Sequence, residues 1–147
     1  MSDQSTALTF RDAVPADADW MARLLSDEGY PAGGTDIVRR LEHYAELQEP
    51  VRVAEMNGER LGFIACAIVP RFEVNETFLR VMAMVVDPAV RERGVGSALM
   101  AEAERAGQEA GVAFLEVTAG HHRPEARRLF ERAGYDAALT SYLRKRL

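Results

Sequence analysis

The segment that most constrains the fold runs from residue 85 to residue 107 and reads VVDPAVRERGVGSALMAEAERAG. It begins with apolar, β-branched residues typical of a buried strand, which Pro88 ends because proline has no N–H to donate within a sheet. Gly94 and Gly96 then precede a run of helix-forming residues, and the periodic apolar positions predict a helix over residues 95–110. A strand, a glycine-containing turn and a helix therefore follow one another here.

The start of that helix is suited to binding an anion. The first N–H groups of a helix have no partner within it, and the helix dipole adds positive charge. Glycines let a bulky phosphate approach, and Arg91 and Arg93 add charge. Two known phosphate signatures are excluded, because the segment has no Gly-Lys-Ser/Thr and places Leu99 where a dinucleotide fingerprint requires its third glycine. The alternative is that the glycines only ease a tight turn.

The composition fits a single globular domain over residues 1–147, with 48% hydrophobic and 28% charged residues. The net charge of −5 argues against a nucleic-acid partner, since phosphate backbones require a basic surface. A lone cysteine, Cys66, excludes an internal disulfide and a multi-cysteine metal site. No apolar run reaches the ~20 residues that a membrane helix needs, and the amino terminus lacks the pattern of a signal peptide. We therefore expect a cytoplasmic protein without a membrane partner.

Alternation and helical periodicity predict an α/β fold, a mixed sheet flanked by about four helices. Asn57-Gly58, a dipeptide that tolerates positive φ, predicts a tight hairpin between two apolar strands within residues 51–69. The tail over residues 135–147 alternates and predicts one or two closing strands. The other expected elements are a strand at 8–14, helices at 15–29 and 35–45, strands at 77–88 and 112–120, and a helix at 124–134. The order is β-α-α-β-β-β-α-β-α-β(-β), with a parallel crossover around the helix at 95–110.

Two segments resemble motifs of the GCN5-related N-acetyltransferase (GNAT) family. VVDPAVRERGVGSALM is similar to the family's Arg/Gln-x-x-Gly-x-Gly/Ala segment, which wraps the pyrophosphate of acetyl-coenzyme A (acetyl-CoA). AGHHRPEARRLFERAGY resembles the family's closing motif, and the predicted element order is also that of the family. The resemblance implies a GNAT-like fold. It also implies an N-acetyltransferase that moves an acetyl group from acetyl-CoA to a primary amine of a small molecule, by direct attack on the thioester.

The resemblance also assigns residues to the acetyl donor. Backbone N–H groups of residues 93–97, the glycine segment, would bind the pyrophosphate with the help of Arg91, and the preceding strand would bind the pantetheine arm. In the closing motif, Phe130 replaces the tyrosine that often protonates the leaving thiolate. The predicted donor-binding residues are Met84, Val85, Val86, Arg91, Arg93, Gly94, Val95, Gly96, Ser97, Arg123 and Phe130.

On the acceptor side, the family often has a glutamate on the strand at 77–88, and here that strand has none. Glu76, with Glu73 behind it, is the nearest carboxylate and is predicted to assist deprotonation of the amine. The residues predicted to contact the acceptor are Tyr30, Pro31, His121 and His122. The two histidines have no acidic partner at metal-ligand spacing, so we expect no metal site.

Two alternatives to a small-molecule acetyltransferase stay open. The chain could acetylate a protein amino terminus or lysine. It could also be a catalytically weak CoA-binding module, as Phe130 and the missing strand glutamate would allow. An exposed carboxyl-terminal strand would permit a homodimer through sheet edges.

Overall fold

A computed structural model describes residues 8–91, 93–119 and 123–147 of the chain. The chain forms two compact units, residues 1–117 and residues 118–147. The first unit contains the sheet and helices α1 to α3, and the second contains helix α4 and the carboxyl-terminal tail.

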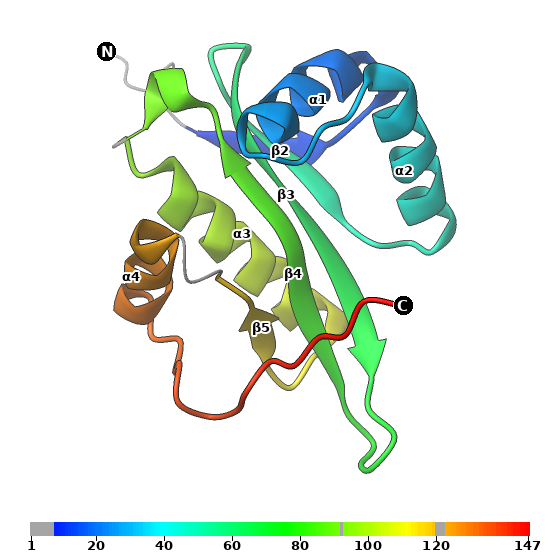
Figure 1. Ribbon diagram of the computed structural model, residues 1–147, viewed down its shortest axis with the longest axis vertical. Helices are drawn as coiled ribbons and strands as arrows, with labels where there is room; N and C mark the ends of the chain where they lie inside the picture. The colour runs from blue at the N-terminus through cyan, green and yellow to red at the C-terminus, as the bar shows by residue number, and fades with distance from the viewer. Residues whose placement is uncertain (1–7, 92, 120–122) are drawn as a thin grey trace. The chain divides into compact units, whose positions relative to one another are not determined.

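The first unit contains a five-stranded sheet in the order β1-β2-β3-β4-β5 (Figure 1). The strands are β1 (Thr9–Asp12), β2 (Val51–Met56), β3 (Glu59–Pro70), β4 (Thr77–Val86) and β5 (Leu115–Val117). All neighbouring strands are antiparallel except β4 and β5, which are parallel. The predicted mixed sheet and parallel pair are confirmed, while β5 is much shorter than the predicted strand at 112–120.

The turn between β2 and β3 has the conformation that its two central residues favour. Asn57 and Gly58 have φ angles of 54° and 77°. Positive φ at both central residues is the requirement of a type I′ turn, whose twist matches that of the strands it joins. The predicted hairpin is confirmed, and Met56 pairs with Glu59 directly across it.

Among its described residues, the first unit has three α-helices. They are α1 (Ala18–Asp27), α2 (Gly34–Glu46) and α3 (Val95–Ala110). A short 3₁₀ turn, η2 (Pro15–Asp17), precedes α1, and a second one, η3 (Pro88–Val90), lies between β4 and the glycine segment. The predicted bounds of α3 are those observed, because a glycine stands at each of its ends.

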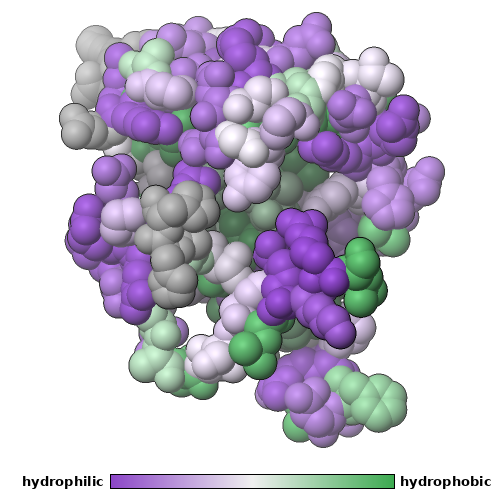
Figure 2. All heavy atoms as spheres, in the orientation of Figure 1, coloured by the Kyte–Doolittle hydropathy of each residue, from purple (hydrophilic) through white to green (hydrophobic). Residues whose placement is uncertain are grey.

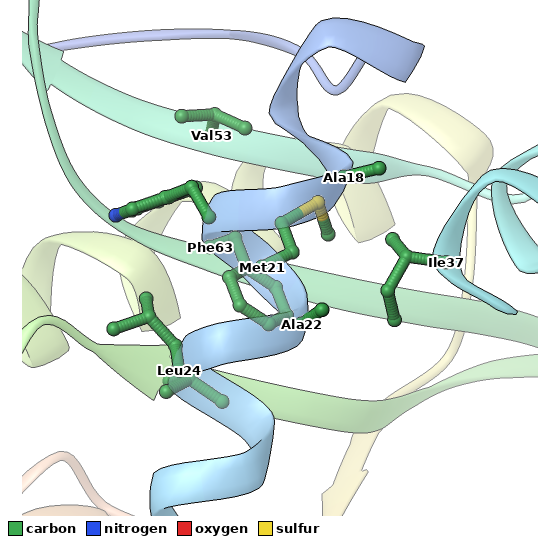
Figure 3. Close-up of a cluster of buried hydrophobic side chains, with 9 residues drawn as sticks. Ala18, Met21, Ala22, Leu24, Ile37, Val53 and Phe63 are labelled. Carbon is green, nitrogen blue, oxygen red and sulfur yellow. The ribbon is translucent and has the colours of Figure 1, made fainter. Parts of the chain in front are cut away.

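α1 and α2 cover one face of the sheet, and the core of the unit lies beneath them. In Figure 3, Met21, Ala22 and Leu24 from α1 lie with Phe63 and Val53 from the sheet and Ile37 from α2. Trp20 belongs to the same cluster and packs edge-on against Phe63, with ring centroids 5.9 Å apart. The outward side of α2 is largely hydrophilic (Figure 2), consistent with Ile37 as its buried residue. Apolar burial thus fixes α1 to the sheet.

α3 packs on the opposite face of the sheet. A Cβ added to Gly62 would lie 2.6 Å from Val85 O and 3.3 Å from Leu99 Cδ1. Because successive residues of a strand point to opposite faces, Gly62 faces α3 while Phe63 faces α1. The missing side chain at Gly62 therefore allows α3 to lie close to the strands that carry the candidate site.

The second unit contains α4 (Pro124–Arg132) and a tail without regular secondary structure. The predicted closing strand within 135–147 is therefore wrong. Alternation marks which face of a strand would be buried, but a strand forms only where a neighbouring edge accepts its hydrogen bonds. Here Leu139, Leu143 and Leu147 are all largely exposed. The homodimer that was inferred from a closing strand stays a prediction without that support.

Candidate active site

The edge of β4 that faces β5 is only partly paired. β5 pairs with Leu79, Arg80 and Val81 of β4 and ends at Val117. Within the described ranges, no other strand pairs with this edge. The second half of β4, residues 82–86, therefore leaves one edge open.

A β-bulge marks the point at which this open edge begins. Ala65 of β3 pairs with Ala83, whereas the next residue, Cys66, pairs with Val81. Met82 is thus an extra residue in β4, and such a residue bends a strand and increases its twist. The bend coincides with the end of β5, so the two strands part at Met82.

Two of the predicted pantetheine-binding residues direct their backbone groups to the open edge. The N–H of Asp87 donates to Leu61 O across the β3–β4 pair, at 2.8 Å. Hydrogen bonds in an antiparallel pair involve every second residue, so Val85 also faces β3 with its N–H and C=O. Met84 and Val86 then point theirs away from β3. A ligand lying along β4 would meet these groups.

The glycine segment leads into α3 with an uncapped helix start. Gly94 has a φ of +76°, a left-handed conformation that costs other residues roughly 1–2 kcal/mol. The N–H of Ala98 donates to Gly94 O at 3.0 Å, the first bond of the helix. The N–H groups of Val95, Gly96 and Ser97 therefore point out of its end, and Gly94 has no side chain to cap them. The segment presents three donors and the positive end of the helix dipole to an anion.

The side chains around this segment hold it in place without covering it. Val90 and Val95 are buried and fix the segment to the core on either side of Gly94. Arg93, Gly94 and Ser97 are exposed. An anion could therefore approach from solvent, beside the guanidinium of Arg93.

Asp87, which the sequence analysis did not single out, ties β4 to the glycine segment. Its Oδ1 accepts the N–H of Ala89 at 3.0 Å, and its C=O accepts the N–H of Val90 at 3.0 Å. Its Oδ2 accepts the indole N–H of Trp20 at 3.5 Å, across 67 positions of sequence. The aspartate before Pro88 is a turn signal in the sequence, but nothing in the sequence indicates the contact with Trp20.

A chain of contacts continues from Trp20 to a buried carboxylate. The guanidinium of Arg60 lies 4.9 Å from the centroid of the Trp20 ring and donates to Asp17 Oδ1 at 3.3 Å. Arg11 donates to both oxygens of Asp17 at 2.8 Å, and the N–H of Val14 donates to it as well. Burial alone would raise the pKa of Asp17, but these hydrogen bonds outweigh it and lower the pKa. A charged Asp17 thus supports the end of β4 through α1.

Arg91, predicted to assist the anion, pairs with a residue that the sequence analysis missed. Its Nη2 lies 3.3 Å from Oε1 of Glu28, the residue that follows the last turn of α1. Trp20 thus links α1 to Asp87, and Glu28 links the end of α1 to Arg91. The only sequence signal for Glu28 is its position two residues before Tyr30, which is predicted to contact the acceptor.

The other predicted residues fall in three places. Tyr30 and Pro31 are exposed in the loop between α1 and α2. Arg123 precedes the first turn of α4, and Phe130 is buried, with its ring centroid 6.3 Å from that of Tyr135; both belong to the second unit. His121 and His122 lie outside the described residues.

Glu73 and Glu76 lie in the hairpin between β3 and β4, at the amino end of β4. Arg71 pairs with both, at 3.3 Å to Glu73 and 2.9 Å to Glu76. The pKa of Glu73 is lowered, first by a hydrogen bond from the residue's own backbone N–H and next by the hydrogen bond from Arg71. The strand between Glu76 and the bulge at Met82 extends over about 20 Å. Their role as base stays a prediction.

A broad groove lies apart from these residues, between β1 and α3. Its charged side chains already pair with one another, because Arg52 contacts Asp12 and Glu102, and Arg105 contacts Glu102 and Glu109. Among the residues placed by the structure, no group of His, Cys, Asp and Glu side chains could hold a metal ion. In the same residues, no helix has the length and apolar character needed to cross a membrane.

Residues 18–135 match the model of the acetyltransferase (GNAT) family. This match covers most of the chain, and the chain belongs to the GNAT family, whose members are acetyl-CoA-dependent N-acetyltransferases. The resemblance read from the two sequence motifs is confirmed.

Individual relatives are distant. The aminoalkylphosphonate N-acetyltransferase of Salmonella typhimurium strain LT2 is 31% identical over 94 residues, which cover 62% of this chain and 61% of that protein. An uncharacterized N-acetyltransferase of Methanocaldococcus jannaschii is 30% identical over 86 residues, which cover 57% of this chain and 38% of that protein. The matched regions span less than two thirds of either relative.

Solved structures share the fold. A GNAT family acetyltransferase from Staphylococcus aureus aligns with a TM-score of 0.79 and 21% identity, covering 96% of this chain and 99% of that one. The predicted α/β GNAT fold is thereby confirmed, whereas identity at this level says nothing of the acceptor.

Proposed function

We propose that this chain transfers an acetyl group from acetyl-CoA to a primary amine of a small molecule. The observation that carries the proposal is the uncapped start of α3 at Gly94, directly after the open edge of β4, in a chain of this family. The pyrophosphate would bind the N–H groups from Arg93 to Ser97, and Arg91 and Arg93 would add positive charge. The pantetheine arm would lie along Met84, Val85 and Val86.

The reaction needs few groups from the protein. The amine nitrogen attacks the thioester carbonyl carbon, the C–N bond forms, the C–S bond breaks, and coenzyme A leaves as a thiolate while the nitrogen loses a proton. A backbone N–H at the open edge of β4 that polarises the carbonyl oxygen would lower the barrier by about 3 kcal/mol. Placement of the thioester along that edge is therefore the main contribution we assign to the chain.

We treat residues 1–147 as one acetyltransferase domain. Arg123 and Phe130 stay predicted to bind the donor. Phe130 has no proton to give, so the thiolate would leave into solvent. A thiol pKa near ~8.5 makes that departure tolerable without a general acid.

The base is a separate proposal. An aliphatic amine with a pKa near ~10 is mostly protonated at neutral pH and has to lose a proton before attack. Glu76, or Glu73 behind it, is the carboxylate that the sequence offers. Both glutamates lie at the amino end of β4. A pH–rate profile of Glu76→Gln and Glu73→Gln tests the proposal directly.

The acceptor is proposed to be a small amine because the matched Salmonella protein is an aminoalkylphosphonate N-acetyltransferase. Tyr30 and Pro31, exposed after α1, would contact the acceptor, and the same role for His121 and His122 stays a prediction from the sequence. The competing functions are acetylation of a protein amino group and coenzyme A binding without turnover.

A thiol-release assay with acetyl-CoA separates these functions. The acceptors are 2-aminoethylphosphonate, spermidine, kanamycin A, a peptide with a free amino terminus and a peptide with an internal lysine. A kcat/KM for one small amine that exceeds both peptides by about tenfold or more supports the proposal. Preference for a peptide favours a protein acetyltransferase, and acetyl-CoA binding without turnover favours a binding module. Activity that persists after dialysis against EDTA supports a reaction without a metal.

A further inference from the structure

The ion pair between Arg80 of β4 and Glu116 of β5 lies on the face of the sheet that α1 and α2 occupy. A Cβ added to Gly107 of α3 would lie 3.1 Å from Leu115 Cδ1 and 3.7 Å from Leu79 Cδ1, so both leucines face α3. Successive residues of a strand point to opposite faces, which directs Arg80 and Glu116 to the other face. Their side chains are 36% and 38% exposed. Solvent therefore reaches the pair on the side away from α3.

The Glu116 carboxylate is held through one of its two oxygens. Nε of Arg80, at 3.2 Å, and Nη2 of Arg80 both donate to Oε1. Among the residues that the structure describes, none donates to Oε2. A carboxylate of this chain that holds two cations is Glu102, which Arg105 and Arg52 both contact. Glu116 has one cation, so its Oε2 is available to a second.

An aromatic stack fixes Arg80, and through it the carboxylate. The guanidinium carbon of Arg80 lies 5.5 Å from the centroid of the Phe78 ring. The rings of Phe78 and Phe114 stack, with centroids 5.0 Å apart and planes inclined by 6°. A guanidinium is attracted to an aromatic face, and its planar fork sets the direction of its hydrogen bonds. Arg80 is therefore committed to Oε1 of Glu116, which leaves Oε2 for another donor.

The pair lies where β4 and β5 part. Glu116 is one residue before Val117, the end of β5, and Arg80 is two residues, about 7 Å, before the bulge at Met82. The proposed donor runs from the glycine segment back along β4, so its thioester end lies towards Met82. Glu76, six residues before Met82, is about 20 Å from the bulge. Glu116 is therefore closer than Glu76 to the expected position of the thioester.

A protonated amine is a cation that suits this position. An aliphatic ammonium carries one positive charge and three N–H donors. One N–H donates to Oε2, the nitrogen loses a different proton to solvent, and its lone pair then attacks the thioester carbonyl. Because the hydrogen bond to Oε2 is made before and after that loss, it holds the nitrogen in place and takes no part in the proton transfer.

We infer that Glu116 is a specificity-determining residue, which binds the ammonium group of the acceptor through Oε2 at the point where β4 and β5 part. This inference rests on the proposed function and deepens it, because a carboxylate at this place selects positively charged acceptors over neutral ones. Tyr30 and Pro31, in the loop between α1 and α2, would contact the rest of the acceptor.

The kinetic test uses the amine of the earlier panel with the largest kcat/KM, at a pH at which that amine is protonated. Glu116→Gln keeps the size of the side chain but removes its charge, so KM should rise about tenfold while kcat stays within about twofold. Glu116→Asp keeps the charge and should stay within about threefold of the wild-type KM. Glu109→Gln is the matched control, because Glu109 also pairs with an arginine, Arg105, at 2.8 Å on α3. It should leave KM unchanged.

A binding test separates the ammonium contact from catalysis. The same amine is titrated by calorimetry into the full chain saturated with coenzyme A, which has no acetyl group to transfer. Glu116→Gln should raise Kd for the amine about tenfold and leave acetyl-CoA affinity within about twofold of the wild type. Thermal unfolding of each variant shows whether the fold is kept, and Glu116→Asp supplies a second variant at the same position.

The outcomes separate this inference from the function beneath it. Absence of acetyl-CoA binding or of amine acetylation by the wild-type chain would overturn the proposed function and the inference together. Normal donor binding with unchanged KM and Kd in Glu116→Gln would overturn the inference alone. A fall in kcat that shrinks as pH rises towards the pKa of the amine would also overturn it, because Glu116 would then act as a base. Raised KM and Kd at an unchanged kcat, restored by Glu116→Asp, support it.

Discussion

The two ends of β4 contain similar kinds of residues but use them in opposite ways. At the amino end, the hairpin contains Arg71, Glu73 and Glu76, whose side chains satisfy one another. Beside it, Arg80 pairs with Glu116, the residue opposite it on β5. Main-chain groups are also paired there, because β5 lies alongside this half of the strand.

At the carboxyl end, main-chain groups point outward instead. β5 has ended, the bulge at Met82 bends the strand, and the helix after Gly94 begins without a capping side chain. Polar side chains there act as supports, as Asp87 does for the turn that precedes the glycine segment. The contrast supports the proposal that the donor binds at this end, where main-chain groups rather than side chains are available.

Apolar side chains also differ between these two ends of β4, being exposed at one and buried at the other. Phe72 and Val74 are exposed at the hairpin, where hydrophobic atoms lie beside hydrophilic ones at the lower end of the molecule in Figure 2. At the other end, Val90 and Val95 are buried and anchor the chain to the core on either side of Gly94. Rigid placement is what a phosphate site requires, since its donors have to stand at fixed positions before the ligand arrives.

The largest effect is expected from Gly94→Val, which should weaken acetyl-CoA binding about 100-fold, equivalent to losing two hydrogen bonds to a charged group. The added side chain would strain the left-handed position and obstruct the phosphate. Gly111→Val is the matched control, because Gly111 has a φ of +74° at the other end of α3 and an added Cβ meets nothing within 4 Å at either glycine. Calorimetry should show comparable loss of thermal stability but normal donor affinity in the control. Gly96→Val should also weaken binding.

The substitution Asp17→Asn tests next the support that Asp17 gives, through α1, to the end of β4. Removing this buried charge should destabilise the fold by about 2 kcal/mol, since Arg11 and Arg60 lose their partner. The folded-state pKa of Asp17 is lowered, so its contribution is complete above the unfolded pKa near ~3.9 and is lost as pH falls through the folded pKa. Urea unfolding of the wild-type chain and the variant should therefore converge in acid. A constant difference down to low pH would contradict this account.

A smaller effect is expected from Asp87→Ala, which removes the side-chain links to Ala89 and Trp20. Acetyl-CoA binding should weaken about tenfold, because the glycine segment loses its fixed position while its own donors stay intact. Asp36→Ala is the control, since Asp36 accepts the N–H of Gly33 at 2.9 Å at the start of α2. Equal donor affinities in the two variants would show that Asp87 does not position the segment.

The last prediction concerns the amino end of β4. If Glu76 or Glu73 is the base, Glu76→Gln or Glu73→Gln should lower kcat/KM at neutral pH about 100-fold, with the loss shrinking towards the pKa of the amine. General-base catalysis needs hydrogen-bond contact, directly or through one water, so values within about twofold of the wild type would remove both glutamates from the mechanism. A pH–rate profile for each variant and for both together decides between these outcomes.

Several parts of the fold and site are readable in the sequence because they depend on only a few neighbouring residues. Asn57-Gly58 fixes its hairpin through positive φ, and Gly94 and Gly111 set the two ends of α3. The assignment of the glycine segment to the donor is likewise a prediction made from its own motif. Steric limits on φ and hydrogen bonds within one turn are local, so local sequence expresses them.

Only the tertiary structure decided the contacts between distant residues. The pairing of Trp20 with Asp87 and of Glu28 with Arg91 depends on how α1 lies on the sheet, which buried side chains such as Met21, Leu24 and Phe63 determine together. The shortness of β5 and the absence of a closing strand in the tail depend on which edges accept partners. A residue pattern indicates which partners a segment can pair with. Packing of the whole unit determines which of those partners it does pair with.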